Sequence, residues 1–367
     1  MSHFNVTIED YSDDGIDFAE QCNNIYIYIE FLNKYYLPFV IAGGLAGNAL
    51  SCTAFLNTPL KTRSSSYYLA ALSVADFGFL LSVFCVYLAH ADLTSAYNTQ
   101  GICQAVVYLS SVCSFLSVWL IVAFSVERFV AVQYPLQRPH VCTVARAKMI
   151  VLCLTIAALV TQSYSVVTAG ILETESDGEV CELLPEYLNA MRVINIVDTM
   201  ITLVIPLLII VAVNAAITRN LLAFRRRHIG PQRVSSNSRT PQIFAVFLKW
   251  FCVKSSVCFH SSSSNLVSTR TQNNITKMLL IISTIFVLLN LPSYAVRFYV
   301  FINFSLWRNE DTPAFLWCLQ QFFMYLYYTN FSINFILYSM CGATFRRCLW
   351  KLILGKIQSV IKLRCCT

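Results

Sequence analysis

Five ionisable side chains lie in apolar stretches of this sequence, where a charge needs a partner or a function. Glu127 and Arg128 stand together near the end of a long apolar run, in FSVERFVAVQYPL, and Asp76 lies inside another run, in LSVAD. Asp198 and Arg297 lie in two further runs. If these runs cross a membrane, each ionisable group is costly and is therefore a candidate functional residue. The alternative for Glu127 and Arg128 is an interfacial position, from which both reach for lipid headgroups.

Asp76 lies near the middle of its apolar run, so its carboxylate cannot reach water by extending. Four amide or hydroxyl side chains recur at a similar depth in other runs: Asn48, Ser117, Asn330 and Asn334. A carboxylate with such neighbours can hold a small cation such as sodium, or it can join helices through hydrogen bonds alone. The sequence predicts one of these two arrangements.

The composition indicates that membrane-spanning helices position these residues. Hydrophobic residues make up 57% of the 367 and charged residues only 12%, whereas about 25% of a soluble protein is charged. A helix needs roughly 20 apolar residues to cross a bilayer. Seven segments meet this requirement: 36–58, 67–90, 102–134, 147–170, 193–220, 275–303 and 314–340. The predicted fold is therefore an all-α membrane protein with a bundle of seven transmembrane helices.

The distribution of basic residues predicts which side of the membrane each end faces. Most of the 26 Lys and Arg follow the first, third, fifth and seventh spans. Cytoplasmic loops are rich in Lys and Arg, so we expect the N-terminus to lie outside. Residues 1–35 are then an extracellular acidic tail, 36–340 the transmembrane domain, and 341–367 an amphipathic helix with a cytoplasmic tail.

Two segments on the cytoplasmic side have their own patterns. The third inner loop, at about 221–274, is predicted to be flexible, and within it the apolar stretch 243–259 is either an interfacial helix or an artefact of sequence assembly. GATFRRCLWKLIL at 342–354 has apolar and basic residues at helical spacing, which predicts a short eighth helix on the membrane surface. Cys365 and Cys366 follow it and are candidates for palmitoylation.

Most of the 15 cysteines lie within spans, where a free cysteine acts as a small apolar residue. Cys103 and Cys181 instead lie on the outer side, where a disulfide persists, and we expect them to pair. Cys22 and Cys318 are also outside, and their pairing is left open. On the same side, Asn5 begins the glycosylation sequon NVT.

Seven short motifs occur in order on successive spans. They are Gly47-Asn48; Asp76; Cys103, which lies 25 residues before Arg128; Glu127-Arg128-Phe129; Pro206; Phe286 with Leu291-Pro292; and Asn334 to Tyr338. In this combination the chain resembles the rhodopsin-like (class A) family of G protein-coupled receptors over about residues 36–352. The resemblance implies a receptor without catalytic residues that responds to an extracellular ligand and activates a heterotrimeric G protein. It also implies arrestin and receptor kinases as partners, but not nucleic acid.

The resemblance also assigns roles at the inner ends of the helices. Glu127 would neutralise Arg128 at rest, and activation would release Arg128 toward the G protein as the sixth helix moves outward. The activation switch comprises Glu127, Arg128, Phe286, Pro292, Asn334 and Tyr338. Four residues depart from the family pattern: Phe129 and Asn214 replace Tyr, Asn290 replaces Trp, and Phe335 replaces Pro. The missing proline predicts a weaker kink in the seventh helix.

The ligand is expected at the outer end. Ser110 stands where receptors for biogenic amines carry Asp, and Tyr328 where opsins carry the Schiff-base Lys, so neither an amine nor light is the expected signal. By the family's geometry the pocket is lined by Tyr87, Gln104, Tyr108, Asp198, Tyr294, Arg297, Phe298, Gln321, Met324 and Tyr325. An aromatic wall with one acid and one base suits a short amidated neuropeptide with a basic side chain, as in neuropeptide receptors. Alternatively, Asp198 and Arg297 pair with each other.

Other classes of protein would make different demands on the sequence. Within the family, the alternative is an orphan or constitutively active receptor. A membrane transporter would show repeated halves and discontinuous helices around a midplane site, and neither is evident. An intramembrane enzyme would need a nucleophile with a base, or a metal cluster, and Asp76 with its amide neighbours supplies neither.

Overall fold

The computed structural model describes residues 27–91, 93–134, 136–174, 178–228, 263–306 and 314–365. Asn5, Cys22, the segment 243–259 and Cys366 lie outside the described residues, so what the sequence predicts for them stays a prediction.

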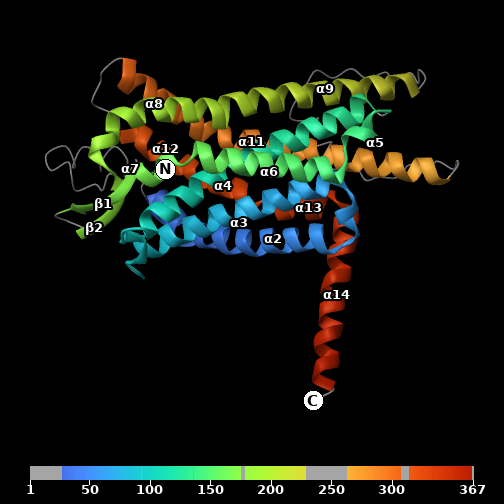
Figure 1. Cartoon of the computed structure of the whole chain (residues 1–367), viewed down its shortest axis with the longest axis horizontal. Helices are drawn as coiled ribbons and strands as arrows, with labels where there is room; N and C mark the ends of the chain where they lie inside the picture. The colour runs from blue at the N-terminus through green and yellow to red at the C-terminus, as the bar shows by residue number, and fades with distance from the viewer. Residues whose placement is uncertain are drawn as a thin grey trace.

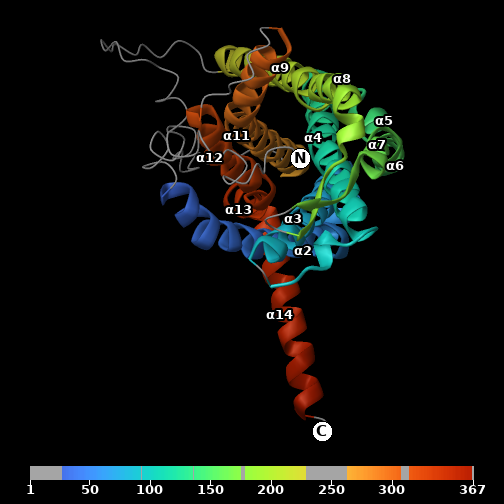
Figure 2. The same cartoon turned by 90° about the vertical axis from the view of Figure 1, so that its left-hand side faces the viewer.

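Long helices dominate the described residues and run roughly along one axis (Figure 1). The first covers Ile27–Asn57, with a π-helical turn at Leu32–Tyr36 followed by α2 at Leu37–Asn57. The others are α3 (Ser64–His90), α4 (Ile102–Gln133), α6 (Val144–Thr161), α8 (Leu188–Thr199) joined to α9 (Ile205–His228) by a π-helical turn at Met200–Val204, α11 (Ser263–Leu306), α12 (Ala314–Ser332) and α13 (Asn334–Cys341). Seen end-on, they surround a common axis (Figure 2).

Short elements connect the long helices. They are the 3₁₀ turns Pro59–Thr62, Ala96–Asn98 and Pro185–Tyr187, and the helices α5 (Arg138–Val141) and α7 (Tyr164–Thr168).

Six of the predicted spans are confirmed, because six helices among the described residues are long and apolar enough to cross a membrane. They are Ile27–Asn57, Ser64–His90, Ile102–Gln133, Val144–Thr168, Val193–Asn220 and Met278–Tyr299. The seventh predicted span corresponds to α12 and α13, which are separated at Ile333. Their sequence is more polar, since it includes two adjacent glutamines and two asparagines.

Helical structure extends beyond several predicted boundaries. The first helix begins at Ile27, within the predicted N-tail, while α9 reaches His228 and α11 begins at Ser263, both inside the predicted third inner loop. The eighth helix, α14 (Ala343–Cys365), is not short, because it continues past residue 354. In each case hydrogen bonding propagates along the helix after the apolar pattern has ended, and the pattern is what set the predicted limits.

A β-hairpin that the sequence analysis did not predict covers one end of the bundle, which we call the hairpin end (Figure 1). Strands β1 (Ala169–Thr174) and β2 (Gly178–Leu183) pair antiparallel, with Ile171 opposite Cys181. The predicted disulfide between Cys103 and Cys181 is confirmed and fixes β2 to the start of α4. Tyr97 packs against it, where burial and the nearby Glu182 raise the pKa of Tyr97 to about 12.

At the opposite end, which we call the α14 end, the chain turns sharply and α14 leaves across the bundle axis (Figures 1 and 2). The Nη1 of Arg346 donates to the carbonyl oxygens of Ser339 (2.7 Å) and Met340 (2.8 Å), which caps the end of α13. A Cβ on Gly342 would lie 2.7 Å from the carbonyl oxygen of Tyr338, so the turn requires a glycine. The direction of α14 is therefore set by local chemistry.

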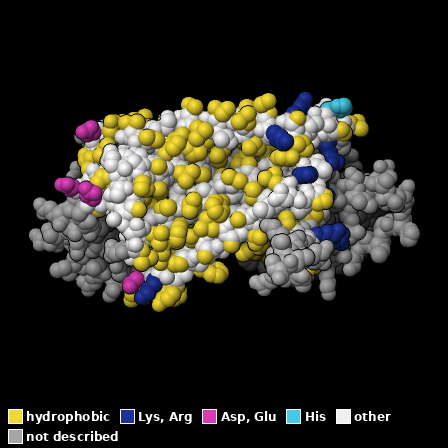
Figure 3. Space-filling model, turned by 60° about the horizontal axis from the view of Figure 1, so that its bottom comes forward, with side chains coloured by type: hydrophobic (Ala, Val, Ile, Leu, Met, Phe, Trp, Pro, Cys, Tyr) yellow, Lys and Arg dark blue, Asp and Glu magenta, His cyan; other side chains and the backbone are white. Residues whose placement is uncertain are grey.

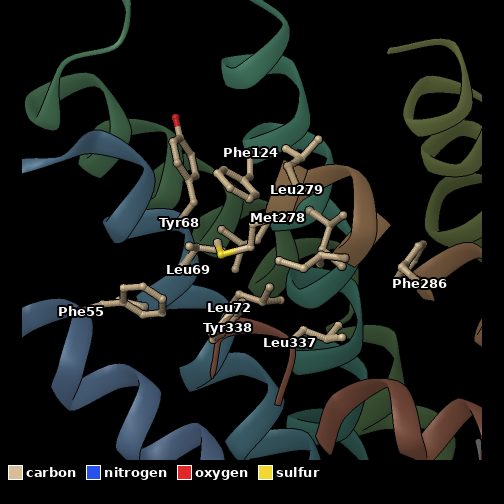
Figure 4. Packing of buried hydrophobic residues seen from close by; sticks show 14 of the residues in the cluster. Phe55, Tyr68, Leu69, Leu72, Phe124, Met278, Leu279, Phe286, Leu337 and Tyr338 are labelled. Carbon is tan, nitrogen blue, oxygen red and sulfur yellow. The ribbon is translucent and has the colours of Figure 1, made fainter. Parts of the chain in front are cut away.

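The surface matches a membrane-spanning bundle. On the face that Figure 3 shows, hydrophobic side chains are spread along the length of the bundle, while most of the visible Lys and Arg lie toward the α14 end and most of the visible Asp and Glu toward the hairpin end. Inside the α14 end, buried side chains of α3, α4, α11 and α13 meet in one cluster, including Leu72, Phe124, Met278, Phe286 and Tyr338 (Figure 4). Two of the predicted switch residues, Phe286 and Tyr338, therefore belong to this core.

Close contact between α2 and α13 gives a test of the packing. A Cβ on Gly47 would lie 2.8 Å from the Cβ of Phe335, whereas one on Gly43, a turn away, would meet nothing within 4 Å. We expect Gly47→Ala to destabilise the protein by about 1–3 kcal/mol through overpacking, seen as a lower melting temperature of the detergent-purified protein. Gly43→Ala is the matched control and should melt like the wild type. Equal melting temperatures of the two variants would contradict a close contact between Gly47 and Phe335.

Candidate functional site

An ion pair between Glu127 and Arg128 closes the α14 end of α4. Both side chains are buried, with 7% and 3% of their surfaces exposed, and the Nη2 of Arg128 donates to the Oε1 of Glu127. The hydroxyl of Ser64, at the start of α3, donates to the same Oε1 at 2.9 Å. The pair is thus buried within the bundle and tied to a second helix, which excludes the interfacial alternative.

The surroundings of this ion pair are rich in cations. The guanidinium of Arg128 lies 5.9 Å from the ring centroid of Phe124, a cation–π contact. Burial and the nearby Arg128 lower the pKa of Arg138, while burial and Glu127 raise the pKa of the Cys142 thiol, whose Sγ lies 3.8 Å from the carbonyl oxygen of Glu127. One carboxylate therefore faces more than one arginine, so positive charge is in excess here.

Asp76 is fully buried and joins three helices. The hydroxyl of Ser117 on α4 donates to its Oδ1 at 2.7 Å, and the amide of Asn334 on α13 donates to its Oδ2 at 2.6 Å. The same amide approaches the carbonyl oxygen of Asn330 at 3.5 Å. Two of the predicted partners therefore contact Asp76 directly, and Asn330 is buried beside them.

This geometry can be compared with the two arrangements predicted for Asp76, a cation site and a hydrogen-bonded junction between helices. A carboxylate with a hydroxyl and amide groups is the oxygen-rich donor set that hard cations take, so the residues present fit sodium in kind. Here, however, the amide nitrogen of Asn334 faces Asp76 and satisfies it by hydrogen bonding. A cation at this point would need the oxygen of that amide to turn inward.

The break in the seventh span lies directly beside Asp76. Span seven is interrupted at Ile333 although Phe335 occupies the position where the family has proline. Asn334 contacts both Asp76 and, across the break, the carbonyl oxygen of Asn330 in α12, and such a side chain offers the backbone an alternative to regular helix. An interruption at this point therefore does not require proline.

The other predicted switch residues lie on α11 and α13. Pro292 lies inside α11, and six residues before it the carbonyl oxygen of Phe286 accepts a hydrogen bond from the Nδ2 of Asn290 at 2.7 Å. Tyr338 is fully buried and packs edge-on against Phe55, with ring centroids 5.3 Å apart. Within the described part of the chain its hydroxyl has no hydrogen-bond partner, so it is a buried polar group that another packing could satisfy.

Toward the hairpin end, Arg297 of α11 lies over two tyrosines. Its guanidinium is 5.5 Å from the ring centroid of Tyr294 and 5.7 Å from that of Tyr327, and its Nη2 lies 2.6 Å from the Sδ of Met324. With its amide turned to satisfy both neighbours, Gln320 accepts a hydrogen bond from the Nε of Arg297 at 2.9 Å. Aromatic faces and neutral acceptors thus surround this cation.

Asp198 and Arg297 are held separately. The Oδ1 of Asp198 accepts a hydrogen bond from the Nε2 of Gln162 at 3.0 Å. Over the described ranges, the ion pair within 4.0 Å is that of Glu127 and Arg128, and none joins Asp198 to Arg297. The alternative in which these two residues neutralise each other is therefore not the arrangement of this structure.

The remaining predicted pocket residues are spread over several contacts. Gln104 accepts from the backbone N–H of Gly101 at 2.6 Å and caps α4, while the hydroxyl of Tyr108 donates to the carbonyl oxygen of Leu159 at 2.9 Å. Tyr87 and Tyr325 pack together against the first helix. Phe298 is 44% exposed and Gln321 is half-buried. The structure brings Tyr294, Arg297 and Met324 together, and a ligand-binding role for the whole set stays a prediction.

Sequence reasoning missed several residues that the structure places at these sites, namely Ser64, Ser114, Gln162, Gln320 and Tyr327. Helical periodicity could have found Gln320 and Tyr327, because residues 320, 324, 327, 331 and 334 lie on one face of a helix. Ser114 similarly lies one turn from Ser117. Ser64 gave no comparable signal, since its contact with Glu127 depends on how α3 packs against α4.

Comparison with known proteins agrees with this architecture. Residues 47–338 match the model of the 7 transmembrane receptor (rhodopsin family). The chain is 26% identical to the somatostatin receptor type 4 of Rattus norvegicus over 88% of its own length and 71% of that protein, and 26% identical to the thyrotropin-releasing hormone receptor of Homo sapiens over 86% and 76%. A shorter match, 28% identical, covers 36% of the chain and 33% of the neuromedin U receptor homolog nmur-2 of Caenorhabditis elegans.

Because the family match covers most of the chain, this protein belongs to the rhodopsin family of seven-transmembrane receptors. It is a multi-pass membrane protein of a class whose members are signalling receptors rather than enzymes. The comparisons therefore favour neither the transporter nor the intramembrane enzyme.

The ion pair at the α14 end gives a test of what stabilises this arrangement. Glu127→Gln removes one partner of a buried pair and should destabilise the resting arrangement by about 3 kcal/mol. Ser64→Ala removes one hydrogen bond and should cost about 1 kcal/mol. We expect ligand-independent nucleotide exchange on a heterotrimeric G protein to rise in both variants, and more in Glu127→Gln, at matched surface level. Unchanged exchange in Glu127→Gln would show that the pair does not restrain the receptor.

Proposed function

We propose that this protein is a plasma-membrane receptor, with its N-terminus outside the cell, that binds a short extracellular peptide and activates a heterotrimeric G protein. The observation that carries the proposal is the combination of a closed Glu127–Arg128 pair at the α14 end with separately held charges, Asp198 and Arg297, toward the other end. The relatives agree, since they are the somatostatin receptor type 4, a thyrotropin-releasing hormone receptor and a homolog of the neuromedin U receptor.

The charged groups at the hairpin end favour a peptide. Arg297 has aromatic faces and neutral acceptors around it, so it can donate to a carbonyl or amide oxygen at the end of a ligand. Asp198 has one neutral partner and can accept a hydrogen bond from a ligand cation. Acidic residues near this end would raise the encounter rate of a basic ligand. An amidated peptide with one basic side chain meets all three conditions.

The α14 end favours a protein partner inside the cell. Half-buried Arg63 and Arg138 lie near Arg128. Burial, and next to it the positive charge of Arg128, lowers the pKa of Arg138. Release of Arg128 from Glu127 would present it to backbone carbonyls of a G protein. Arrestin and receptor kinases would meet the same end, and α14 would lie on the membrane with palmitoylated Cys365 as an anchor.

Arg128 and Arg297 should separate coupling from binding. Arg128→Ala is expected to keep peptide affinity within about threefold and to lose G protein activation, because it removes the group released toward the partner. Arg297→Ala is expected to weaken peptide binding by about 2 kcal/mol, the typical value of a hydrogen bond to a charged group. Radioligand binding and nucleotide exchange, measured at equal surface level with a panel of amidated peptides, check both. A normal response from Arg128→Ala would contradict the proposed role.

We also propose that Asp76 holds sodium with Ser117, Asn330 and Asn334, since their oxygens suit a hard cation. A bound cation would stabilise the packing in which these groups lie together. NaCl should therefore raise the melting temperature of the purified receptor relative to choline chloride at equal ionic strength. Asp76→Asn, which keeps the shape and removes the charge, should abolish this difference. An equal effect of NaCl on both proteins would exclude a sodium site at Asp76.

A further inference from the structure

Tyr327 lies where four helices meet between the two ends of the bundle. Its side chain is buried, with 1% exposed, and its hydroxyl lies 2.7 Å from the Oγ of Ser114, which joins α12 to α4. Its ring also packs edge-on against Tyr294 of α11 at 6.0 Å and Phe79 of α3 at 5.7 Å. A single side chain thus contacts three neighbouring helices.

On the side of the hairpin end, Tyr327 contacts the proposed ligand site. The guanidinium of Arg297 lies over the ring of Tyr327 as well as over that of Tyr294. A ligand oxygen that draws Arg297 away from these rings would weaken both cation–π contacts. Tyr327 is therefore placed to respond when Arg297 changes its partner.

On the other side, Tyr327 leads to the Asp76 site by two routes. Ser114 lies one helical turn from Ser117, which donates to Asp76. The ring of Tyr327 also packs against Phe331 at 5.1 Å. Phe331 in turn stacks on Phe79, with ring centroids 3.8 Å apart. Phe79 lies three residues after Asp76 on α3. A shift of Tyr327 cannot leave these neighbours in place, because the interior is close-packed.

Asn290 of α11 does not link its helix to another through its amide nitrogen. The Nδ2 of Asn290 donates to the carbonyl oxygen of Phe286 in its own helix. Its Oδ1 has no hydrogen-bond partner within the described ranges. The hydrogen bond between Tyr327 and Ser114 therefore joins α12 to α4 without the help of this amide.

We propose that Tyr327 is the positioning residue through which the ligand site acts on the inner switch, and that its hydrogen bond with Ser114 stabilises the resting packing. The inference rests on the proposed receptor function. The bond between Tyr327 and Ser114 coexists here with the closed Glu127–Arg128 pair, so we expect it to favour the resting packing over the active one. Breaking the bond shifts the population toward the active packing even without ligand.

A double-mutant cycle with a matched control tests this proposal. Tyr327→Phe removes the hydroxyl and keeps the ring, and Ser114→Ala removes the partner hydroxyl. Tyr36→Phe is the control, since it deletes a tyrosine hydroxyl that makes another 2.7 Å bond to span seven, at Thr329, away from α4 and α11. Glu127→Gln serves as the positive reference. Ligand-independent nucleotide exchange per surface receptor and the melting temperature are measured for each.

The expected result has three parts. Tyr327→Phe and Ser114→Ala each raise ligand-independent exchange by about 2- to 10-fold, the effect of one hydrogen bond on a two-state equilibrium. The double variant equals either single variant, because both remove the same bond. Tyr36→Phe changes exchange by less than about 1.5-fold, although it removes a similar bond.

Two results would overturn the proposal. If Tyr327→Phe lowers only the melting temperature, or if its effect adds to that of Ser114→Ala, the bond is merely structural or the two residues act separately. In either case Glu127→Gln still raises exchange, so the receptor function stands. If Glu127→Gln is also silent with every G protein class, the receptor function fails and this inference fails with it.

Discussion

The buried ion pair of Glu127 and Arg128 is the interaction on which the rest of the structure depends. Taking both charges out of water is costly, and their attraction offsets that cost only while the pair stays closed and hydrogen-bonded. Ser64 supplies the additional hydrogen bond and ties the pair to α3. The packing of α3 against α4 and the pairing of these two residues therefore depend on each other.

Helix α4 connects this pair to the rest of the bundle. It is fixed at the hairpin end by the disulfide of Cys103, contacts α12 through Ser114, and reaches Asp76 through Ser117. These polar contacts lie along one helix whose last turns carry Glu127 and Arg128. Movement of α11 or α12 at the hairpin end can thus reach the switch through a few specific hydrogen bonds, and two alternative packings suffice.

Much of this arrangement could be predicted from the sequence because the cost of burying charge limits the choices. Asp76 needs polar partners at its own depth, which predicted its bonds to Ser117 and Asn334. Two cysteines on the outer side predicted the disulfide. Other features could not be predicted. The β-hairpin forms largely in a loop between two spans, where the apolar pattern used to predict the helices is absent. The contact of Ser64 with Glu127 depends on how α3 is rotated against α4. Tyr327 was not singled out, because a tyrosine within an apolar span is typical of the hydrophobic core.

The most direct test of the central claim is an experimental structure of the receptor bound to a nucleotide-free heterotrimeric G protein, in complex with an activating peptide. The account predicts that in this complex the guanidinium of Arg128 has left Glu127 and contacts the G protein, and that the hydroxyl of Tyr327 has left Ser114. A complex in which Glu127 and Arg128 remain paired would contradict it, because the pair would then not be what holds the receptor at rest.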